Sequence, residues 1–239
     1  MDSPLPSTRA EATSGRETSR LADVEQFLGQ AIGAGAPVRR TVLGRSAGGH
    51  PIPMVLAGHR LPDDGESAHR AGRLVVAIQA TIHGGEVEGK EAVLAFLRDL
   101  LRDDPTRLLH RTVLLVVPVL NPDGNDAWGD FRRNRPHQDG PERIGERPNA
   151  QGLDLNRDHV KLDTPEISAV VREIYRRWDP DLFLDLHTTN GTRHGFHHTD
   201  APPTHPNTPP AVLEWCRERL LPSVRHRLRR ELGWECFDY

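Results

Sequence analysis

The short segment His83-Gly84-Gly85-Glu86 places an imidazole and a carboxylate three positions apart. Two side chains at this spacing in a tight turn can converge on one cation, and the glycines permit unusual backbone conformations. Zinc accepts histidine nitrogen and carboxylate oxygen together, and two histidines with one glutamate form a known catalytic ligand set. The alternative interpretation is a turn at the start of a helix, in which His83 and Glu86 are simply solvated.

His187 is the best candidate for a third metal ligand, because it directly follows the apolar run Asp181–Leu186. Between Glu86 and His187 lie 187 − 86 − 1 = 100 residues, which is enough for the chain to leave a sheet and return to the same edge. The chain has 13 histidines, so a single histidine is weak evidence, and a capping histidine is the alternative. The combination with His83 and Glu86 favours a metal site.

Asn156 and Arg157 could bind a carboxylate, because an amide and a planar guanidinium suit bidentate capture of that group. Asp154 lies just before them and could accept the free ring N–H of a ligand histidine. The alternative is a surface turn held together by local Asp–Arg pairs.

Arg132 lies in the basic run Phe131–Arg135, with the sequence FRRNR. A cation beside a metal ion could stabilise a developing oxyanion. A solvated arginine-rich loop is the alternative interpretation.

Hydrophobic patterning predicts the elements that must position these side chains. Short apolar runs typical of strands alternate with segments of helical periodicity, which predicts an α/β sheet with helices on both faces. Ligands of such sheets gather at the carboxyl ends of the strands. The predicted strands are Val38–Leu43, Ile52–Leu56, Leu74–Thr81, Val113–Val119 and Asp181–Leu186, and the predicted helices are Leu21–Gly33, Gly89–Leu101, Pro165–Trp178 and Ala211–Leu232.

Composition narrows the class of protein. The chain has 239 residues, with 31 Lys+Arg against 34 Asp+Glu, so its net charge of −3 argues against a nucleic-acid-binding protein. No apolar stretch is long enough for a membrane helix, and residues 1–20 lack the apolar core of a signal peptide, so we expect a cytoplasmic location by default. Residues 1–20 are polar and are predicted to be a disordered leader, with a catalytic domain over residues 21–239.

The motifs occur together in an order that resembles the zinc carboxypeptidase family, the metallopeptidases of the carboxypeptidase A type. The resemblance covers roughly residues 74–191. The segments that carry it are HGGE at His83–Glu86, NPDG at Asn121–Gly124, FRRNR at Phe131–Arg135, LDLNRD at Leu153–Asp158 and LDLHTTNG at Leu184–Gly191.

The resemblance implies a three-layer α/β fold with a mixed, mostly parallel sheet. It implies removal of the C-terminal residue from a peptide or acylated amino acid with a free carboxylate, by a water that one Zn2+ activates. The roles that it implies for residues of this chain are as follows: His83, Glu86 and His187 bind the zinc, Arg132 polarises the scissile carbonyl, Asn156 and Arg157 hold the terminal carboxylate, and Asp154 supports a ligand histidine.

One departure from the family pattern concerns the general base, which in the family is a glutamate on a late strand. Only 239 − 187 = 52 residues follow His187, and none of their glutamates has a buried-strand context. We therefore expect a domain that lacks its last strands and its base, with impaired activity. The alternatives are a zinc N-acyl amino acid deacylase of the aspartoacylase type and a zinc-binding module that recognises carboxylates without cleavage.

Overall fold

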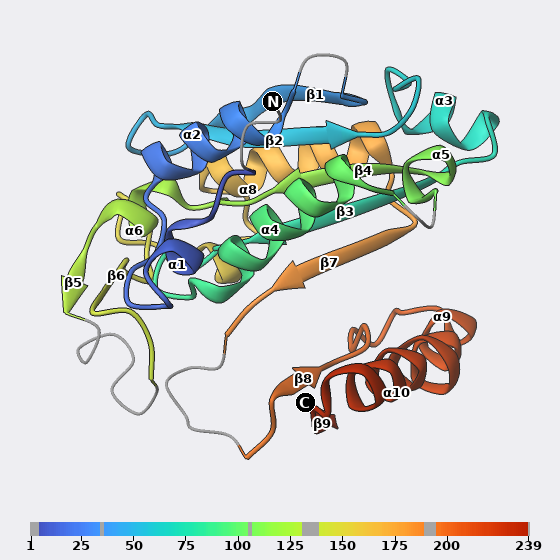
Figure 1. Cartoon of the computed structure of the whole chain (residues 1–239). Helices are drawn as coiled ribbons and strands as arrows, with labels where there is room; N and C mark the ends of the chain where they lie inside the picture. The colour runs from blue at the N-terminus through green and yellow to red at the C-terminus, as the bar shows by residue number, and fades with distance from the viewer. Residues whose placement is uncertain (1–4, 34–35, 105–106, 131–138, 189–194, 239) are drawn as a thin grey trace. The chain divides into compact units, whose positions relative to one another are not determined.

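A mixed sheet with strand order β1-β2-β4-β3-β7 forms the centre of the fold (Figure 1). The computed structural model describes residues 5–33, 36–104, 107–130, 139–188 and 195–238. Strand β2 pairs antiparallel with both β1 and β4, whereas β3 lies parallel to both β4 and β7. The bounds are β1 Val38–Arg45, β2 Pro51–Ala57, β3 Leu74–Ala80, β4 Thr112–Val117 and β7 Leu182–Leu186. The predicted α/β class and its mixed sheet are confirmed.

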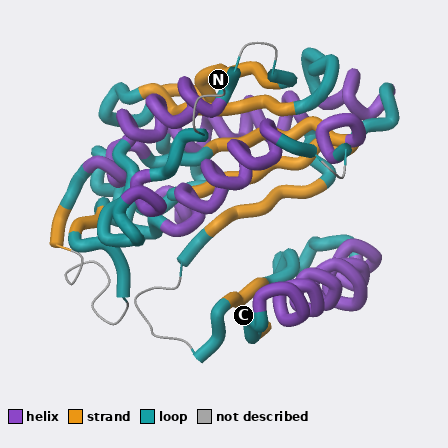
Figure 2. The backbone as a smooth tube through the Cα atoms, viewed as in Figure 1, coloured by secondary structure: helices purple, strands orange, loops and turns teal. Residues whose placement is uncertain are grey.

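Helices cover both faces of this sheet (Figure 2), as the near-continuous apolar runs of the inner strands require. On one face, helices α2 (Leu21–Ala31) and α4 (Glu88–Arg102) bury a cluster that includes Phe27, Leu97 and Val116. Strand β4 is buried at every position, because apolar side chains lie against it from both layers.

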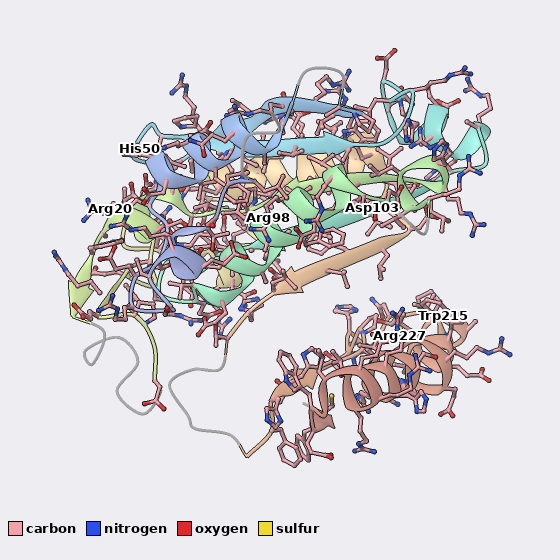
Figure 3. The ribbon with its side chains drawn as sticks, viewed as in Figure 1. Arg20, His50, Arg98, Asp103, Trp215 and Arg227 are labelled. Atoms are coloured by element: carbon pink, nitrogen blue, oxygen red, sulfur yellow. The ribbon has the colours of Figure 1, made fainter. Side chains whose placement is uncertain are left out.

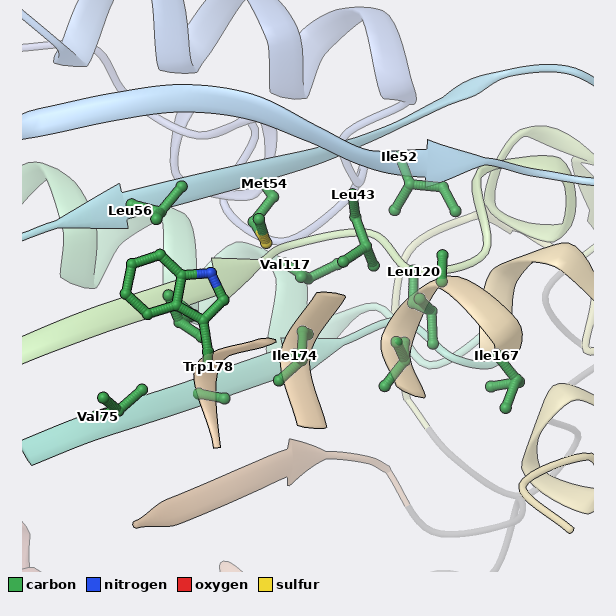
Figure 4. Close-up of a cluster of buried hydrophobic side chains, with 14 of the residues drawn as sticks. Leu43, Ile52, Met54, Leu56, Val75, Val117, Leu120, Ile167, Ile174 and Trp178 are labelled. Carbon is green, nitrogen blue, oxygen red and sulfur yellow. The ribbon is translucent and has the colours of Figure 1, made fainter. Parts of the chain in front are cut away.

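The opposite face is covered by α8 (Pro165–Ala169), which continues as one π-helical segment, Val170–Arg176. Helix α8 begins where the sequence predicts, with the Thr164 side chain accepting a hydrogen bond from the Ile167 N–H. Figure 4 shows the buried cluster on this face, in which Ile167, Ile174 and Trp178 meet side chains of the sheet. The predicted three-layer arrangement therefore matches the structure.

Shorter elements connect these layers within residues 1–191. Helix α4 follows β3 after the His83–Glu86 turn, and α6 follows β4 at the NPDG segment, where the Asn121 side chain accepts from the Gly124 N–H. The shorter elements are α1 Arg9–Ala12, α3 Gly65–Arg70, α5 Leu108–Arg111, α6 Pro122–Asp126, β5 Gly129–Asp130, β6 Arg143–Ile144 and the 3-10 turn Leu155–Arg157.

The chain divides into two compact units, residues 1–191 and residues 192–239. The second unit contains one long helical stretch that matches the predicted helix and ends at Gly233, whose φ of 67° is the left-handed conformation that glycine favours. Trp215, labelled in Figure 3, lies on this stretch and is 48% exposed. The elements of this unit are β8 His198–Asp200, α9 Pro210–Trp215, the π-helical segment Cys216–Leu220, α10 Leu221–Leu232 and β9 Cys236–Asp238.

Among the described residues, no helix has the length and apolar character needed to cross a bilayer.

Segment 5–20, within the predicted disordered leader, contacts helix α4. The buried Glu91 carboxylate accepts hydrogen bonds from the Thr18 hydroxyl at 2.8 Å and from the Ser19 N–H at 2.6 Å. Beside it, the fully buried Lys90 ammonium donates to the Ser19 carbonyl oxygen at 2.6 Å. Two buried charges on α4 thus obtain partners from the polar segment 5–20, which offsets the cost of their burial.

Helix α4 also holds the start of this segment. The Arg98 side chain, labelled in Figure 3, donates to the Pro6 carbonyl oxygen at 3.1 Å and to a Glu11 carboxylate oxygen at 2.7 Å. Glu11 in turn belongs to a capping box with Thr8 at the start of α1. The leader is therefore fixed to α4 at two places.

We predict that Glu91→Ala lowers the free energy of unfolding by about 2–4 kcal/mol, because it leaves buried N–H and O–H donors without an acceptor. Urea denaturation of the purified protein measures this change. The matched control is Glu66→Ala, which removes an ion pair with Arg70 whose side chains are 81% and 70% exposed, and it should change stability little. Equal losses for the two variants would contradict the anchoring of the leader by Glu91.

Candidate metal centre

The turn between β3 and α4 carries His83 and Glu86 at the carboxyl end of a buried parallel strand. Both side chains are buried, with exposed fractions of 3% and 7% for the residues. The turn packs closely on its neighbours, since a Cβ added at Gly84 would lie 2.1 Å from the Gly124 backbone. Only glycine permits this approach, and neither Gly84 nor Gly85 has a positive φ, so close packing rather than an unusual backbone conformation requires glycine at position 84.

His187 joins this pair because β7 runs parallel to β3. The register pairs Ala80 with Leu186, so the residues that follow both strands emerge at the same edge of the sheet. Ligand atoms of His83, Glu86 and His187 all lie within 4.8 Å of one another. The structure thus brings together the three residues that the sequence singles out, although they come from strands far apart in the chain.

The Glu86 carboxylate lies between the two imidazoles. Its Oε1 is 2.8 Å from His83 Nδ1, and its Oε2 is 2.9 Å from His187 Nδ1. An imidazole lone pair and a carboxylate oxygen repel at such distances unless a proton or a cation lies between them. Two Nδ1 atoms and one carboxylate converging in this way form a donor set that fits zinc.

Each histidine is held from its other ring nitrogen by an aspartate. His83 Nε2 lies 3.1 Å from Asp154 Oδ1, as the sequence analysis anticipates for Asp154. His187 Nε2 lies 2.9 Å from Asp185 Oδ2, a contact that was not predicted from the sequence. Both Nε2 atoms therefore face an aspartate, and both Nδ1 atoms face Glu86.

Arg147 is a further residue of the site that the sequence does not indicate. Its Nε donates to Asp154 Oδ2 at 2.9 Å, and its Nη1 lies 3.3 Å from His83 Nδ1 and 3.6 Å from a Glu86 oxygen. It lies between the HGGE and LDLNRD segments in a polar stretch without a distinctive pattern. Asp185 could have been found from the sequence. It lies two residues before His187, and in an extended chain this spacing places both side chains on the same side.

The site groups have strongly shifted acidities. Burial raises the pKa of Glu86, but hydrogen bonds with His187 and His83 outweigh burial and lower that pKa to about 2. Burial lowers the pKa of His187, yet the Asp185 and Glu86 carboxylates outweigh it and raise the pKa to about 10. Burial of Asp154 is likewise outweighed by Arg147 and His83, so its pKa lies below the usual value. The carboxylates remain ionised at neutral pH and attract positive charge.

The two residues predicted to bind the substrate carboxylate closely follow Asp154 in the sequence. Asp154 caps the 3-10 turn that contains Asn156 and Arg157, and its Oδ1 accepts from the Asn156 N–H at 2.9 Å. The Arg157 side chain is exposed and donates to the Asn156 carbonyl oxygen at 2.8 Å. Arg132 lies outside the described residues, so its predicted role stays a prediction.

Comparison with known proteins identifies a family. A family model described as "Zinc carboxypeptidase" matches residues 36–216. "Probable carboxypeptidase 2" of Arthroderma benhamiae is 30% identical over 146 residues, which are 60% of this chain and 24% of that protein. "Carboxypeptidase D" of Homo sapiens is 29% identical over 191 residues, covering 64% of this chain and 13% of that protein.

Solved structures with the same fold are also similar. A metallo-carboxypeptidase from Pseudomonas aeruginosa, in complex with (2-guanidinoethylmercapto)succinic acid, has a TM-score of 0.64 and 26% identity and covers 89% of this chain and 49% of that chain. A metallo-carboxypeptidase from Burkholderia cenocepacia has a TM-score of 0.66 with 21% identity, covering 93% and 53%. The chain therefore spans about half the length of these structures and about a quarter or less of the curated relatives cited above.

We predict that zinc binding at pH 7–8 releases one proton from His187. Both nitrogens of this ring lie against carboxylate oxygens, and its pKa is raised from 6.5 to about 10, so the free protein holds the ring protonated. A metal ligand must be deprotonated, so zinc affinity should increase as pH rises toward about 10.

Isothermal titration calorimetry in buffers of different ionisation enthalpy measures the protons released per zinc. His187→Ala should lose this released proton together with most of the affinity. A zinc affinity that is independent of pH between 6 and 8 would contradict the predicted proton release.

Proposed function

This chain belongs to the zinc carboxypeptidase family, and we propose that it forms the metal-binding part of a metallocarboxypeptidase in which His83, Glu86 and His187 hold one Zn2+. The observation that carries this proposal is the convergence of two Nδ1 atoms and one carboxylate within 4.8 Å, at the carboxyl ends of parallel strands. A zinc ion bound there would act as a Lewis acid that activates water for hydrolysis of a peptide bond.

The substrate class follows from the residues beside the metal centre. We assign Asn156 and Arg157 to binding of the free C-terminal carboxylate of a peptide or acylated amino acid. The support is their position on the turn that Asp154 caps, together with the contact from Asp154 to His83. The exposed Arg157 guanidinium can form two parallel hydrogen bonds to a carboxylate. Arg132 is assigned to polarising the scissile carbonyl, from the family resemblance alone.

Residues 1–239 contain the proposed zinc ligands, but fast turnover also requires a general base. The four glutamates after His187 are Glu214, Glu218, Glu231 and Glu235. The first three are helical, and Glu235 precedes strand β9 and pairs with Arg229 at 2.7 Å. None of them has the strand context of the family's base, and general-base catalysis contributes about 10²–10⁴-fold. We therefore propose that this chain by itself binds zinc and C-terminal carboxylates but hydrolyses peptides slowly.

We predict that the purified chain binds one zinc per molecule by elemental analysis after removal of excess metal. His83→Ala and Glu86→Ala should each reduce zinc affinity at least about 100-fold, because each removes a ligand. Asp181→Asn is a control directly before β7 and outside the centre, since its carboxylate contacts His69 and the Val75 N–H instead. Zinc binding that is unaffected by the His83 and Glu86 changes would contradict the proposed centre.

A second prediction concerns the substrate. A peptide with a free C-terminal carboxylate should bind the zinc-loaded chain, whereas the same peptide with a C-terminal amide should bind much more weakly. Arg157→Ala should reduce the affinity about 10- to 100-fold, as expected for loss of a charge-assisted bidentate contact. Fluorescence anisotropy of a labelled peptide measures both comparisons. Rapid hydrolysis that is abolished by a chelator would contradict the proposed lack of a base.

A further inference from the structure

The apolar strands β3 and β7 each contain one polar residue, and these two residues lie opposite each other in the sheet. Gln79 is the one polar residue in Leu74–Ala80, and Asp185 is the one charged residue in Leu182–Leu186. The register pairs their Cα atoms, and Gln79 Nε2 donates to Asp185 Oδ1 at 3.1 Å. A hydrogen-bonded pair in otherwise apolar strands indicates a role other than packing.

Asp185 connects this pair to the metal centre. Its Oδ1 accepts from Gln79, and its Oδ2 lies 2.9 Å from His187 Nε2. When a cation lies between Nδ1 and Glu86, the proton of the neutral His187 ring is on Nε2, because the Asp185 carboxylate that faces this nitrogen only accepts. The Nδ1 lone pair is then left for the side of the ring that faces Glu86, at 2.9 Å. The aspartate therefore selects both the tautomer and the rotation of the ring.

Gln79 has a polar atom that packing alone does not explain. The residue is fully buried, and its Oε1 has no hydrogen-bond partner among the described residues. An aliphatic side chain of similar length would avoid this unpaired carbonyl. The opposite amide orientation would direct Oε1 at the Asp185 carboxylate, which also carries negative charge. The contribution of Gln79 thus lies in the N–H that it donates.

We propose that Gln79 and Asp185 are positioning residues that hold His187 in the tautomer and orientation needed for zinc binding; this inference rests on the proposed role of His187 as a ligand. The other histidine has an analogous support, in which Asp154 contacts His83 and accepts from Arg147. The two supports differ in charge, because Arg147 is a cation and Gln79 is a neutral donor.

Zinc affinity of the full chain, measured by competition with a chromophoric chelator, tests the proposal. Asp185→Ala should weaken zinc binding about 10- to 100-fold, the usual effect of losing such a support. Gln79→Met should weaken it by about threefold to tenfold. At the same time, the thermal midpoint of the metal-free protein should be equal or higher, since methionine fills the same volume without an unpaired carbonyl.

The combined result for Gln79→Met separates positioning from structure, because a merely structural glutamine would lose stability instead. The matched control is Thr188→Val. It removes the hydrogen bond from the Thr188 hydroxyl to Glu88, at 2.6 Å, next to His187 but outside the Gln79–Asp185 pair. Its zinc affinity should stay within about twofold of the wild type.

Nuclear magnetic resonance of 15N-labelled histidine gives a readout that does not depend on affinity. The zinc-loaded wild type should show a slowly exchanging Hε2 signal for His187, and Asp185→Ala should lose that signal. Normal zinc binding by the wild type, with unchanged affinity and Hε2 signal in the variants, would overturn the positioning role alone. A wild-type chain that binds no zinc, or a His187→Ala variant that binds as tightly, would overturn the proposed function as well.

Discussion

The parallel pairing of β3 with β7 is the constraint on which the rest of the site depends. It aligns Ala80 with Leu186, so that the turn after one strand and the residue after the other reach the same edge of the sheet. Side chains alternate across a strand, so a slip of one residue would move Asp185 and His187 to the opposite face. The core opposes such a slip, because the partly buried Phe183 and Leu186 of β7 pack against the clusters on opposite faces of the sheet and would exchange faces. Packing of the core therefore determines the geometry of the polar centre.

Negatively charged groups outnumber positively charged ones in the metal centre. Glu86, Asp154 and Asp185 all approach the two imidazoles, and Arg147 is the cation that the described structure places against them. Such an excess of negative charge is costly in a protein interior unless it is balanced. His187 balances part of it by taking up a proton, and a divalent cation would balance it with greater charge density. The same arrangement therefore accounts for the shifted acidities and for the suitability of the centre for zinc.

Sequence patterns predicted the layers of the fold and the three converging residues because both follow from local rules. Strand-like runs locate the sheet, and polar residues directly after those runs locate its functional edge. Arg147 was not predictable in this way, because only the folded path of the loop brings it to Asp154. Gln79 was visible as a polar residue in an apolar run, but its partner could be identified only from the strand register. Composition also does not indicate that polar groups of segment 5–20 are partners for the buried charges Lys90 and Glu91.

The distance along the chain between the two halves of the metal centre has a thermodynamic consequence. His83 and Glu86 belong to the turn after β3, whereas His187 follows β7, which pairs with the body of the sheet through β3. An ion shared by these residues would act as a cross-link that closes a loop of about 100 residues, in the manner of a disulfide. It would limit the freedom of the unfolded chain while securing the outer strand against fraying. Loss of the metal should therefore weaken the pairing of β7 with β3, and loss of that pairing should weaken metal binding.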